Sequence, residues 1–291
     1  MPSLKDVQMK IVGVKKTSQI TKAMNMVAAA KLRGAQQKME DFRPYADEFN
    51  NAMTSMSANM ETSLFPLMEV REVNSVELVV VTSDRGLCGS FNAHILKVAE
   101  KEMNRLEGEG KKVSFVCVGK KGNAYFKKTG KVRKSYPDIM GTFQMFNARE
   151  IAQEAAANFL AGETDEVSLV YGEFVSVAVQ RPAVRALLPI QPVADDAAEA
   201  SIGAGGDFIY EPSPTEIMDV LLPLYLNVMV YHAVLEVGAS EHAARMTAMD
   251  NATNACTDII DNLTLIYNKA RQAGITAELM DIVGGAEALK G

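Results

Sequence analysis

The last third of the chain carries apolar and small residues at alternating steps of three and four. The series runs through Met246, Met249, Thr253, Cys256, Ile260, Leu263, Tyr267 and Ala270. This spacing places every member on one narrow stripe of a helix, which is the pattern of a coiled-coil partner. Pro223 is the last proline, so one helix is expected over residues 215–289. At about 1.5 Å per residue it would be about 110 Å long, against roughly 30 Å for a small domain. It therefore needs a second helix and, beyond that, another protein.

The first residues of the chain predict the second helix. Ser3 and Asp6 have the spacing of a capping box, so we expect the helix to begin near Leu4 and to run to about Ser57. Its apolar positions are Leu4, Val7, Ile11 and Val14 and, after a slip in the spacing, Ile20, Met24 and Val27. Both ends of the chain thus offer a long helix with an apolar stripe, and we expect the two helices to pack together.

Chain connectivity sets the direction of this pairing. One helix enters the central segment near residue 60 and the other leaves it near residue 212, so the joined ends lie together and the helices run antiparallel. About 20 residues of the last helix then extend about 30 Å past the first. The apolar residues of this extension are Ile275, Leu279, Met280, Ile282, Val283 and Leu289. A helix that is apolar on several faces favours an enclosed position. A frayed terminus is the alternative, although frayed ends are usually polar.

Between the two helices, β-branched runs alternate with helical segments. The expected strands are 76–82, 112–118 and 166–171, with two further strands or an edge hairpin in 175–190, and the expected helices are 91–106, 123–128 and 148–160. This alternation predicts a doubly wound, Rossmann-like α/β domain. Residues 194–207 are small, acidic and glycine-rich, which predicts a surface loop. We therefore divide the chain into an N-terminal coiled-coil helix at 1–60, an α/β domain at 72–210 and a C-terminal coiled-coil helix at 211–291.

Charge is unevenly distributed along the chain. The formal net charge is −6, but residues 1–43 hold nine Lys or Arg against three acids, so they carry +6 and the remainder carries −12. A basic helix on an acidic protein favours an acidic partner surface, and a solvated helix face explains any single lysine equally well. No unbroken apolar run approaches the roughly 20 residues that cross a bilayer, and residues 1–10 do not resemble a signal peptide. We therefore expect a protein of the cytoplasm or of the cytoplasmic face of a membrane.

The turn at 83–90 follows the first strand, where α/β folds often bind a phosphate. It lacks the three-glycine fingerprint and the P-loop lysine, so the phosphate signal is weak. Cys88 and His94 offer a thiolate nucleophile with a histidine base, but no catalytic motif surrounds them. His232 and His242 lie ten residues apart, off the spacing of shared metal ligands. We expect no catalytic residue, no cofactor and no metal, and we expect the three widely spaced cysteines to be reduced.

Three stretches of this sequence resemble one family. They are KKTSQITKAMNMVAAAKLR near the start, SDRGLCGSFN after the first strand, and ASEHAARMTAMDNATNACTDIIDNLTLIYNKARQAGITAELMDIVGGAEAL at the end. Together they resemble the gamma subunit of bacterial F-type ATP synthases over essentially the whole chain. No targeting segment precedes the first helix and no cysteine-bearing regulatory insert interrupts the α/β domain, which fits a bacterial rather than an organellar member.

The resemblance implies a rotor that is not itself catalytic. In this family the terminal helices form an antiparallel coiled coil inside a ring of three alpha and three beta subunits, and the α/β domain stands on the membrane ring of c subunits beside the epsilon subunit. Rotation couples proton or sodium flow to ATP synthesis or hydrolysis. The implied location is the cytoplasmic face of the bacterial inner membrane, as a peripheral protein without membrane insertion and without nucleic acid.

The resemblance also assigns contacts to particular residues. The contacts with the alpha and beta ring fall on Lys22, Met24, Arg33, Arg271, Gln272 and Thr276. The C-terminal tip in an apolar sleeve comprises Leu279, Ile282, Val283 and Leu289, and Glu211 is the foot contact with epsilon and the membrane ring. Two departures are Asn25, where the family often has a charged residue, and Gly274, where an alanine is common and which softens the helix locally.

Two other functions compete with the rotor. A static coiled-coil tether or adaptor with an α/β head has the same pair of helices, but it tolerates a covalent link to its partner where a rotor stops. A small enzyme built on Cys88 and His94 loses its activity when Cys88 is replaced by alanine, whereas a rotor loses only packing.

Overall fold

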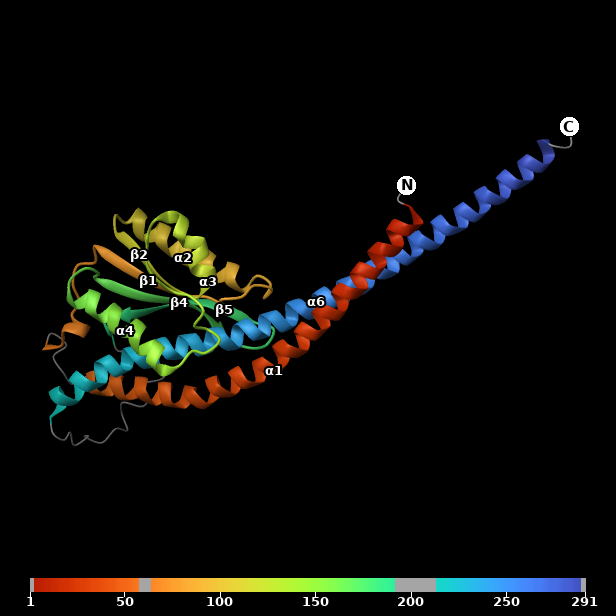
Figure 1. Cartoon of the computed structure of the whole chain (residues 1–291). Helices are drawn as coiled ribbons and strands as arrows, with labels where there is room; N and C mark the ends of the chain where they lie inside the picture. The colour runs from red at the N-terminus through yellow and green to blue at the C-terminus, as the bar shows by residue number, and fades with distance from the viewer. Residues whose placement is uncertain (1–2, 58–63, 192–212, 289–291) are drawn as a thin grey trace. The chain divides into compact units, whose positions relative to one another are not determined.

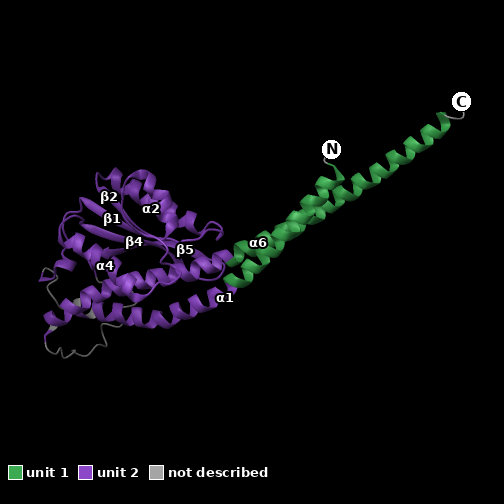
Figure 2. Cartoon of the chain, in the orientation of Figure 1, with its two compact units in different colours: residues 1–28, 246–291 green, residues 29–245 purple. Residues whose placement is uncertain are grey.

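The computed structural model describes residues 3–57, 64–191 and 213–288. The chain divides into two compact units (Figure 2): residues 1–28 with 246–291 form unit 1, and residues 29–245 form unit 2. Two long helices contribute to both units, namely α1 (Leu4–Ser57) and α6 (Pro214–Ala288). Each unit is described separately below. The predicted bounds of the first helix, about 4–57, and the predicted start of the last helix near residue 215 are confirmed within one residue, whereas its predicted end at residue 289 lies outside the described residues.

Unit 2 is built on a five-stranded sheet with the order β3-β2-β1-β4-β5. The strands are β1 (Ser75–Val81), β2 (Lys112–Val118), β3 (Val132–Tyr136), β4 (Glu166–Phe174) and β5 (Gln180–Leu188). The first four strands pair in parallel, and β5 pairs antiparallel with β4. Helices cover both faces (Figure 1), so the doubly wound α/β fold predicted from the sequence is confirmed.

The helices of unit 2 explain why the central strands are apolar on both faces. On one face lie α2 (Phe91–Gly108), α3 (Lys120–Phe126) and the short 3-10 helix η3 (Lys127–Thr129), and on the other lie α4 (Met145–Leu160) and α6 (Figure 1). A further 3-10 helix, η2, spans Pro66–Met68. Because β1 and β2 are covered from both sides, they read as continuous apolar runs rather than as alternating ones.

Two local predictions differ from the structure. The basic stretch Val132–Tyr136 forms the edge strand β3, which sequence reasoning missed because only its last residue is fully buried. Residues 175–190 hold one strand, β5, rather than the two strands or the hairpin predicted within this range, because β5 pairs antiparallel with the preceding strand β4 at the edge of the sheet. Pro182 fits this position, since an edge strand has backbone N–H groups that need no partner. The loop predicted at 194–207 lies outside the described residues.

Within unit 2, α1 and α6 pack against each other through a mixed aromatic and aliphatic seam. The Phe42 and Tyr231 rings meet edge to face at 4.9 Å, and the Phe49 and Tyr225 rings stack at 6.3 Å. The Tyr225 hydroxyl also lies 3.3 Å from Asn50 Oδ1. The partners are joined in the order expected of antiparallel helices, because residue numbers rise along one helix as they fall along the other.

The helix α6 also satisfies the length and composition criteria for a membrane span. An 18-residue window has a mean hydropathy of 1.6, although no unbroken apolar run of that length exists, and 61% of the window is buried inside the folded chain. A mostly buried window of this kind is also what a core helix carries, and α6 residues such as Leu226, Val230 and Val237 are part of the core of unit 2.

A tight backbone approach behind β1 gives a stability test. Gly119 has φ +94°, and a Cβ added there would lie 2.1 Å from the Thr82 carbonyl oxygen. We expect Gly119→Ala to lower the free energy of unfolding by about 2 to 4 kcal/mol in urea denaturation, through backbone strain and overpacking. Gly108→Ala is the control: nothing lies within 4 Å of its added Cβ, and we expect it to be neutral or stabilising by up to about 1 kcal/mol. Equal effects of the two substitutions would contradict the packing described here.

Candidate functional site

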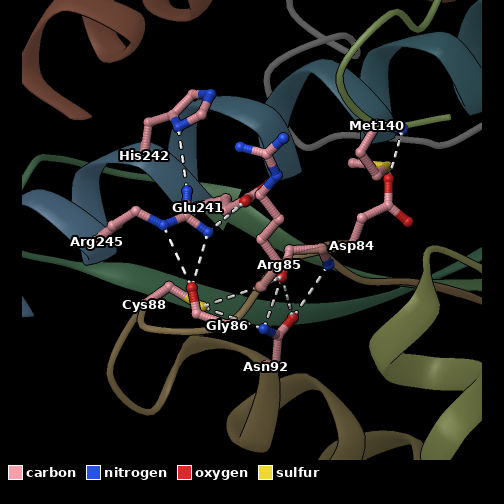
Figure 3. Close-up of polar contacts among 10 residues, drawn as sticks. Asp84, Arg85, Gly86, Cys88, Asn92, Met140, Glu241, His242 and Arg245 are labelled. Carbon is pink, nitrogen blue, oxygen red and sulfur yellow. Dashed lines mark hydrogen bonds and ion pairs between the residues drawn. The ribbon is translucent and has the colours of Figure 1, made fainter. Parts of the chain in front are cut away.

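The carboxyl edge of the sheet in unit 2 is the place where an α/β fold of this kind binds ligands. In this chain α6 occupies it (Figure 3). The Arg245 guanidinium donates to the Gly86 carbonyl oxygen from Nε at 3.3 Å and from Nη2 at 3.1 Å, and Nη2 also bonds the Glu241 carboxylate at 2.6 Å. Ser240, on the same helix, donates to the Gly172 carbonyl oxygen at the end of β4. Polar groups of α6 therefore bond this edge of the sheet directly.

The backbone N–H groups that would cradle a phosphate are engaged by the carboxylate of Asp84. It accepts hydrogen bonds from the N–H groups of Lys120, Asp138 and Met140, each at 3.0 Å. These donors come from the loops after β2 and β3, so one side chain from the turn after β1 ties three loops together. An anionic ligand at this edge would have to displace Asp84. The weak phosphate signal in the sequence is explained by a structural role of this turn.

Cys88 is a poor candidate for a nucleophile. It is buried, it accepts a hydrogen bond from Asn92 Nδ2 at 3.1 Å, and burial raises the pKa of its thiol. His94 is exposed on α2. A thiol with a raised pKa supplies little thiolate at neutral pH. Over the described ranges, no group of three or more His, Cys, Asp or Glu is placed to hold a metal ion.

Two titratable groups beside Arg245 have pKa values shifted by burial. Burial raises the pKa of the Glu241 carboxyl, and Arg245 opposes that shift. Burial, together with the nearby charge of Arg245, lowers the pKa of His242 to about 4. The His242 ring therefore stays neutral, with Nδ1 accepting from Arg245 Nη1 at 3.3 Å. This cluster holds α6 to the turn after β1.

In unit 1, α1 and α6 form the predicted antiparallel pair. All eight residues of the α6 series from Met246 to Ala270 are buried or half-buried. On α1 the covered positions are Leu4, Val7, Ile11, Val14, Ser18, Thr21, Asn25 and Ala28, an unbroken series of steps of three and four. The predicted slip through Ile20, Met24 and Val27 is wrong at Ile20 and Val27, whose side chains are 60% and 58% exposed, whereas Met24 is half-buried beside the stripe. The stripe instead continues through polar and small residues.

Polar contacts fix the register of this pair. The Thr21 and Thr253 hydroxyls lie 2.7 Å apart, and Asn25 donates to the Met246 carbonyl oxygen at 2.9 Å. Seventeen residues from Thr21 along α1 lead to Leu4, and the same number from Thr253 along α6 leads to Ala270. The 18 residues from Arg271 to Ala288 thus extend past the start of α1, about 27 Å of helix. Figure 2 shows this extension within unit 1.

The residues assigned to partner contacts fall in separate places. Lys22 is exposed and Met24 is half-buried on α1 in unit 1, whereas Arg33 is exposed on the part of α1 that belongs to unit 2. Arg271, Gln272 and Thr276 are exposed on the α6 extension. The described tip residues Leu279, Ile282 and Val283 are 59%, 72% and 51% exposed. Glu211 and Leu289 lie outside the described residues.

Sequence reasoning missed several polar residues that hold the helices in place. Thr21 and Asn25 continue the steps of three and four that begin at Leu4, so the spacing alone would have identified them. Glu236 and Glu241 are acidic residues in an otherwise apolar stretch of α6, which is a signal of buried pairing. Glu241 has its partner Arg245 four residues on, a local signal, whereas the partner of Glu236 cannot be found in this way, because Arg43 is 193 residues away.

Comparisons with known proteins agree on one family. The model of the ATP synthase family matches residues 3–289. The chain is 65% identical over 290 residues to the ATP synthase gamma chain of Desulfotalea psychrophila and 53% identical over 293 residues to that of Nitratidesulfovibrio vulgaris strain Miyazaki F, each match covering all of both chains.

Solved structures show the same fold. A chain from the central stalk and c-ring of the Tetrahymena thermophila mitochondrial ATP synthase matches with a TM-score of 0.63 at 27% identity, covering 80% of this chain and 99% of that one. A chain from the rotor of the Euglena gracilis mitochondrial ATP synthase matches with a TM-score of 0.67, covering 94% and 98%. The latter is 21% identical and supports the fold alone.

The buried pair of Arg245 and Glu241 yields a stability prediction. Arg245→Met leaves Glu241 as a buried carboxylate without its ion-pair partner, so we expect the free energy of unfolding to fall by about 3 kcal/mol. The matched control is Arg105→Met, because Arg105 pairs with two glutamates at a site where its side chain is 52% exposed. There we expect a change within about 0.5 kcal/mol. Urea denaturation of both variants measures the difference, and similar losses would show that Arg245 is not buried as described.

The lowered pKa of His242 yields a pH prediction. In the unfolded chain this ring takes up a proton near its ordinary pKa of 6.5, whereas in the folded chain it does so only near 4. Its contribution to stability is therefore complete above pH 6.5 and is lost as the pH falls toward 4. Allowing for partial exposure, we expect a loss of about 1 to 2 kcal/mol.

The measurement compares unfolding free energies of the parent chain and His242→Asn between pH 7.5 and 4. Asparagine keeps an acceptor for Arg245 but does not titrate in this range. We expect the difference between the two chains to shrink as the pH falls. A difference that is independent of pH would contradict the assignment.

Proposed function

The chain belongs to the ATP synthase gamma-chain family, and from this premise we propose how it acts as the central rotor of an F-type ATP synthase. Rotation of the gamma chain couples ion flow through the membrane part of the complex to ATP synthesis or hydrolysis in the catalytic part. In our proposal the chain makes and breaks no bonds itself. Its asymmetric surface gives the catalytic sites of the surrounding ring different affinities in turn, which is an allosteric transition driven mechanically.

The observation that carries this proposal is the unequal helix pair of unit 1. Past Ala270, α6 has no mate within the described residues, yet the extension exposes Ile275, Leu279, Met280, Ile282 and Val283. Five large apolar side chains along 18 residues are an unfavourable surface to leave in water and a typical one to cover with another protein. A sleeve of apolar groups would enclose them without directional hydrogen bonds that have to break as the helix turns.

Residues 9–22 of α1, in unit 1, offer a different kind of surface. Met9, Val12 and Ile20 are about half exposed or more on α1, and lysines such as Lys15 and Lys22 stand exposed among them. Apolar groups between mobile positive charges suit transient contacts with an acidic partner, because exposed ion pairs are individually weak and easily exchanged. We propose that this surface faces the alpha and beta subunits.

We propose the individual contacts as the family resemblance assigns them. Those with the alpha and beta ring are Lys22, Met24, Arg33, Arg271, Gln272 and Thr276. Those of the tip in the apolar sleeve are Leu279, Ile282, Val283 and Leu289, and Glu211 is the foot contact with the epsilon subunit and the c-ring. Thr276 donates to the Gln272 carbonyl oxygen in the free chain, so its hydroxyl is already held in one orientation.

The proposed roles of the parts of the chain follow the predicted domains. We propose that the helices at 1–60 and 211–291 form the shaft and that the α/β domain at 72–210 forms the foot. The complex is membrane-associated, and we place this chain at the cytoplasmic face of the bacterial inner membrane as a peripheral subunit. The apolar window of α6 does not argue for insertion, because 61% of it is buried within the chain. The coupled ion is a proton or sodium.

Purified complex tests the proposal directly. Mixing this chain with the alpha and beta subunits of its own organism should yield an assembly that hydrolyses ATP, while the chain alone should show no activity. Failure of the three proteins to form an active complex would reject the rotor. Hydrolysis by the chain alone that is lost in Cys88→Ala would favour the enzyme built on Cys88.

A reversible cross-link separates a rotor from a static tether. Lys22→Cys places a thiol on exposed α1, where the native thiols Cys88, Cys117 and Cys256 do not compete because they are buried. With a second cysteine on the facing beta subunit, we expect oxidation to lower ATP hydrolysis by at least tenfold and reductant to restore it. Complexes with either single cysteine control for oxidation itself. Full activity in the linked complex would show that the chain does not turn.

A further inference from the structure

Glu236 of α6 lies where both long helices meet the sheet in unit 2. Its carboxylate is 1% exposed and is fully engaged: Oε1 bonds Arg43 Nη2 of α1 at 2.9 Å, and Oε2 accepts from the backbone N–H of Phe174 at 2.7 Å. His232, one turn earlier on α6, places Nε2 3.4 Å from Oε1. Phe174 is the last residue of β4, so one side chain joins α1, α6 and the β4–β5 hairpin.

The other contacts between α6 and the sheet are mostly apolar. Met218, Leu222, Leu226, Met229, Val230, Val234 and Val237 are buried there. Apolar packing is strong but nearly independent of direction, so it resists separation of two surfaces better than it resists sliding. A charge-assisted hydrogen bond depends on both distance and angle, and it resists displacement along the helix.

Stability alone does not account for this arrangement. Removing a carboxylate and a guanidinium from water costs several kcal/mol, and buried ion pairs are often no more stabilising than apolar side chains of the same volume. Two directional bonds on one buried carboxylate, one to α1 and one to β4, are instead what is needed to hold α6 and these two elements in a single relative position.

We propose that Glu236 is a positioning residue of the rotor, which locks the α/β domain to both shaft helices so that torque applied to the domain turns the helices without slip. The proposal rests on the rotor function. Arg43 is its partner on α1, and the Phe174 N–H is its partner on the sheet. Loss of the joint should leave the catalytic sites intact and loosen the connection between ATP hydrolysis and ion movement.

The test uses the complete complex in inverted membrane vesicles and measures two rates, ATP hydrolysis and ATP-driven ion pumping. For Glu236→Leu we expect hydrolysis to stay above half of the parent rate while ions pumped per ATP fall at least threefold. Glu236→Gln keeps an acceptor for the Phe174 N–H, so its number of ions pumped per ATP should lie between those of Glu236→Leu and the parent. Arg43→Met, at a side chain that is 44% exposed, removes only the bond to α1, and we expect it to lower the number of ions pumped per ATP by about as much as Glu236→Gln does.

Glu77 supplies the matched control. Its side chain is also fully buried, and it pairs with Arg133 of β3 at 2.5 Å, whereas among the described residues it has no hydrogen bond or ion pair with α1 or α6. Glu77→Leu should therefore destabilise the α/β domain without changing the pumping ratio. Arg43→Lys, which keeps a donor and the charge, should recover part of what Arg43→Met loses.

Two results would overturn the proposal. An unchanged pumping ratio in both Glu236→Leu and Arg43→Met would show that the joint carries no torque. An equal fall in Glu77→Leu would assign the effect to loss of stability. If Glu236→Leu does not assemble, an unchanged pumping ratio in both Arg43→Met and Glu236→Gln would overturn the proposal instead. Absence of any pumping by the parent complex, by contrast, would refute the rotor function itself.

Discussion

In unit 1 the two long helices each carry apolar and small side chains at steps of three and four residues, and they bury these side chains against each other. The α/β domain lies between the two helices in the sequence, and its connections make them antiparallel. In unit 1 the register is set by the Thr21 and Thr253 hydroxyls and by Asn25, which donates to the Met246 carbonyl oxygen. A polar layer in an apolar seam gives up some stability and gains a single register. That register decides how much of α6 lies beyond α1, and the unpaired extension is the surface from which the function follows.

The α/β domain keeps the architecture of a ligand-binding fold and uses the carboxyl edge of its sheet for another purpose. Arg245 and Ser240 bond the turn after β1 and the end of β4, Asp84 occupies the N–H groups of neighbouring loops, and Glu236 ties α6 to β4 and α1. The carboxyl edge that accepts a cofactor in other proteins here accepts a helix of the same chain. A fold of this class thus serves as an attachment for a shaft, and fold alone would have indicated the wrong function.

Much of this could be predicted from the sequence, because the decisive signals are local and periodic. The start of α1 follows from a capping box, and the helix continues through Pro44 to the predicted end at Ser57. The strand β2 follows from a valine-rich run and has the predicted bounds of 112–118. The prediction for α1 is wrong at Ile20 because it follows hydrophobic residues, whereas the buried stripe follows the regular spacing of three and four. The strand β3 is not predicted because Lys134 and its neighbours have the composition of a solvated turn. The joints at Glu236 and Arg245 depend on partners more than 150 residues away, which no local pattern reveals. The contacts assigned to Lys22, Arg271 and their companions involve other subunits, so they stay predictions.

The central claim is that this chain turns inside its partners while they hydrolyse ATP. The most direct measurement fixes the alpha and beta ring to a surface, attaches a bead to an exposed position on the α/β domain such as Lys127, and follows the bead by microscopy as ATP is added. The account predicts rotation in one direction with three equally spaced pauses per turn, one for each catalytic site of a threefold ring. A bead that stays still, or that only fluctuates about one angle while the immobilised complexes hydrolyse ATP, would contradict it.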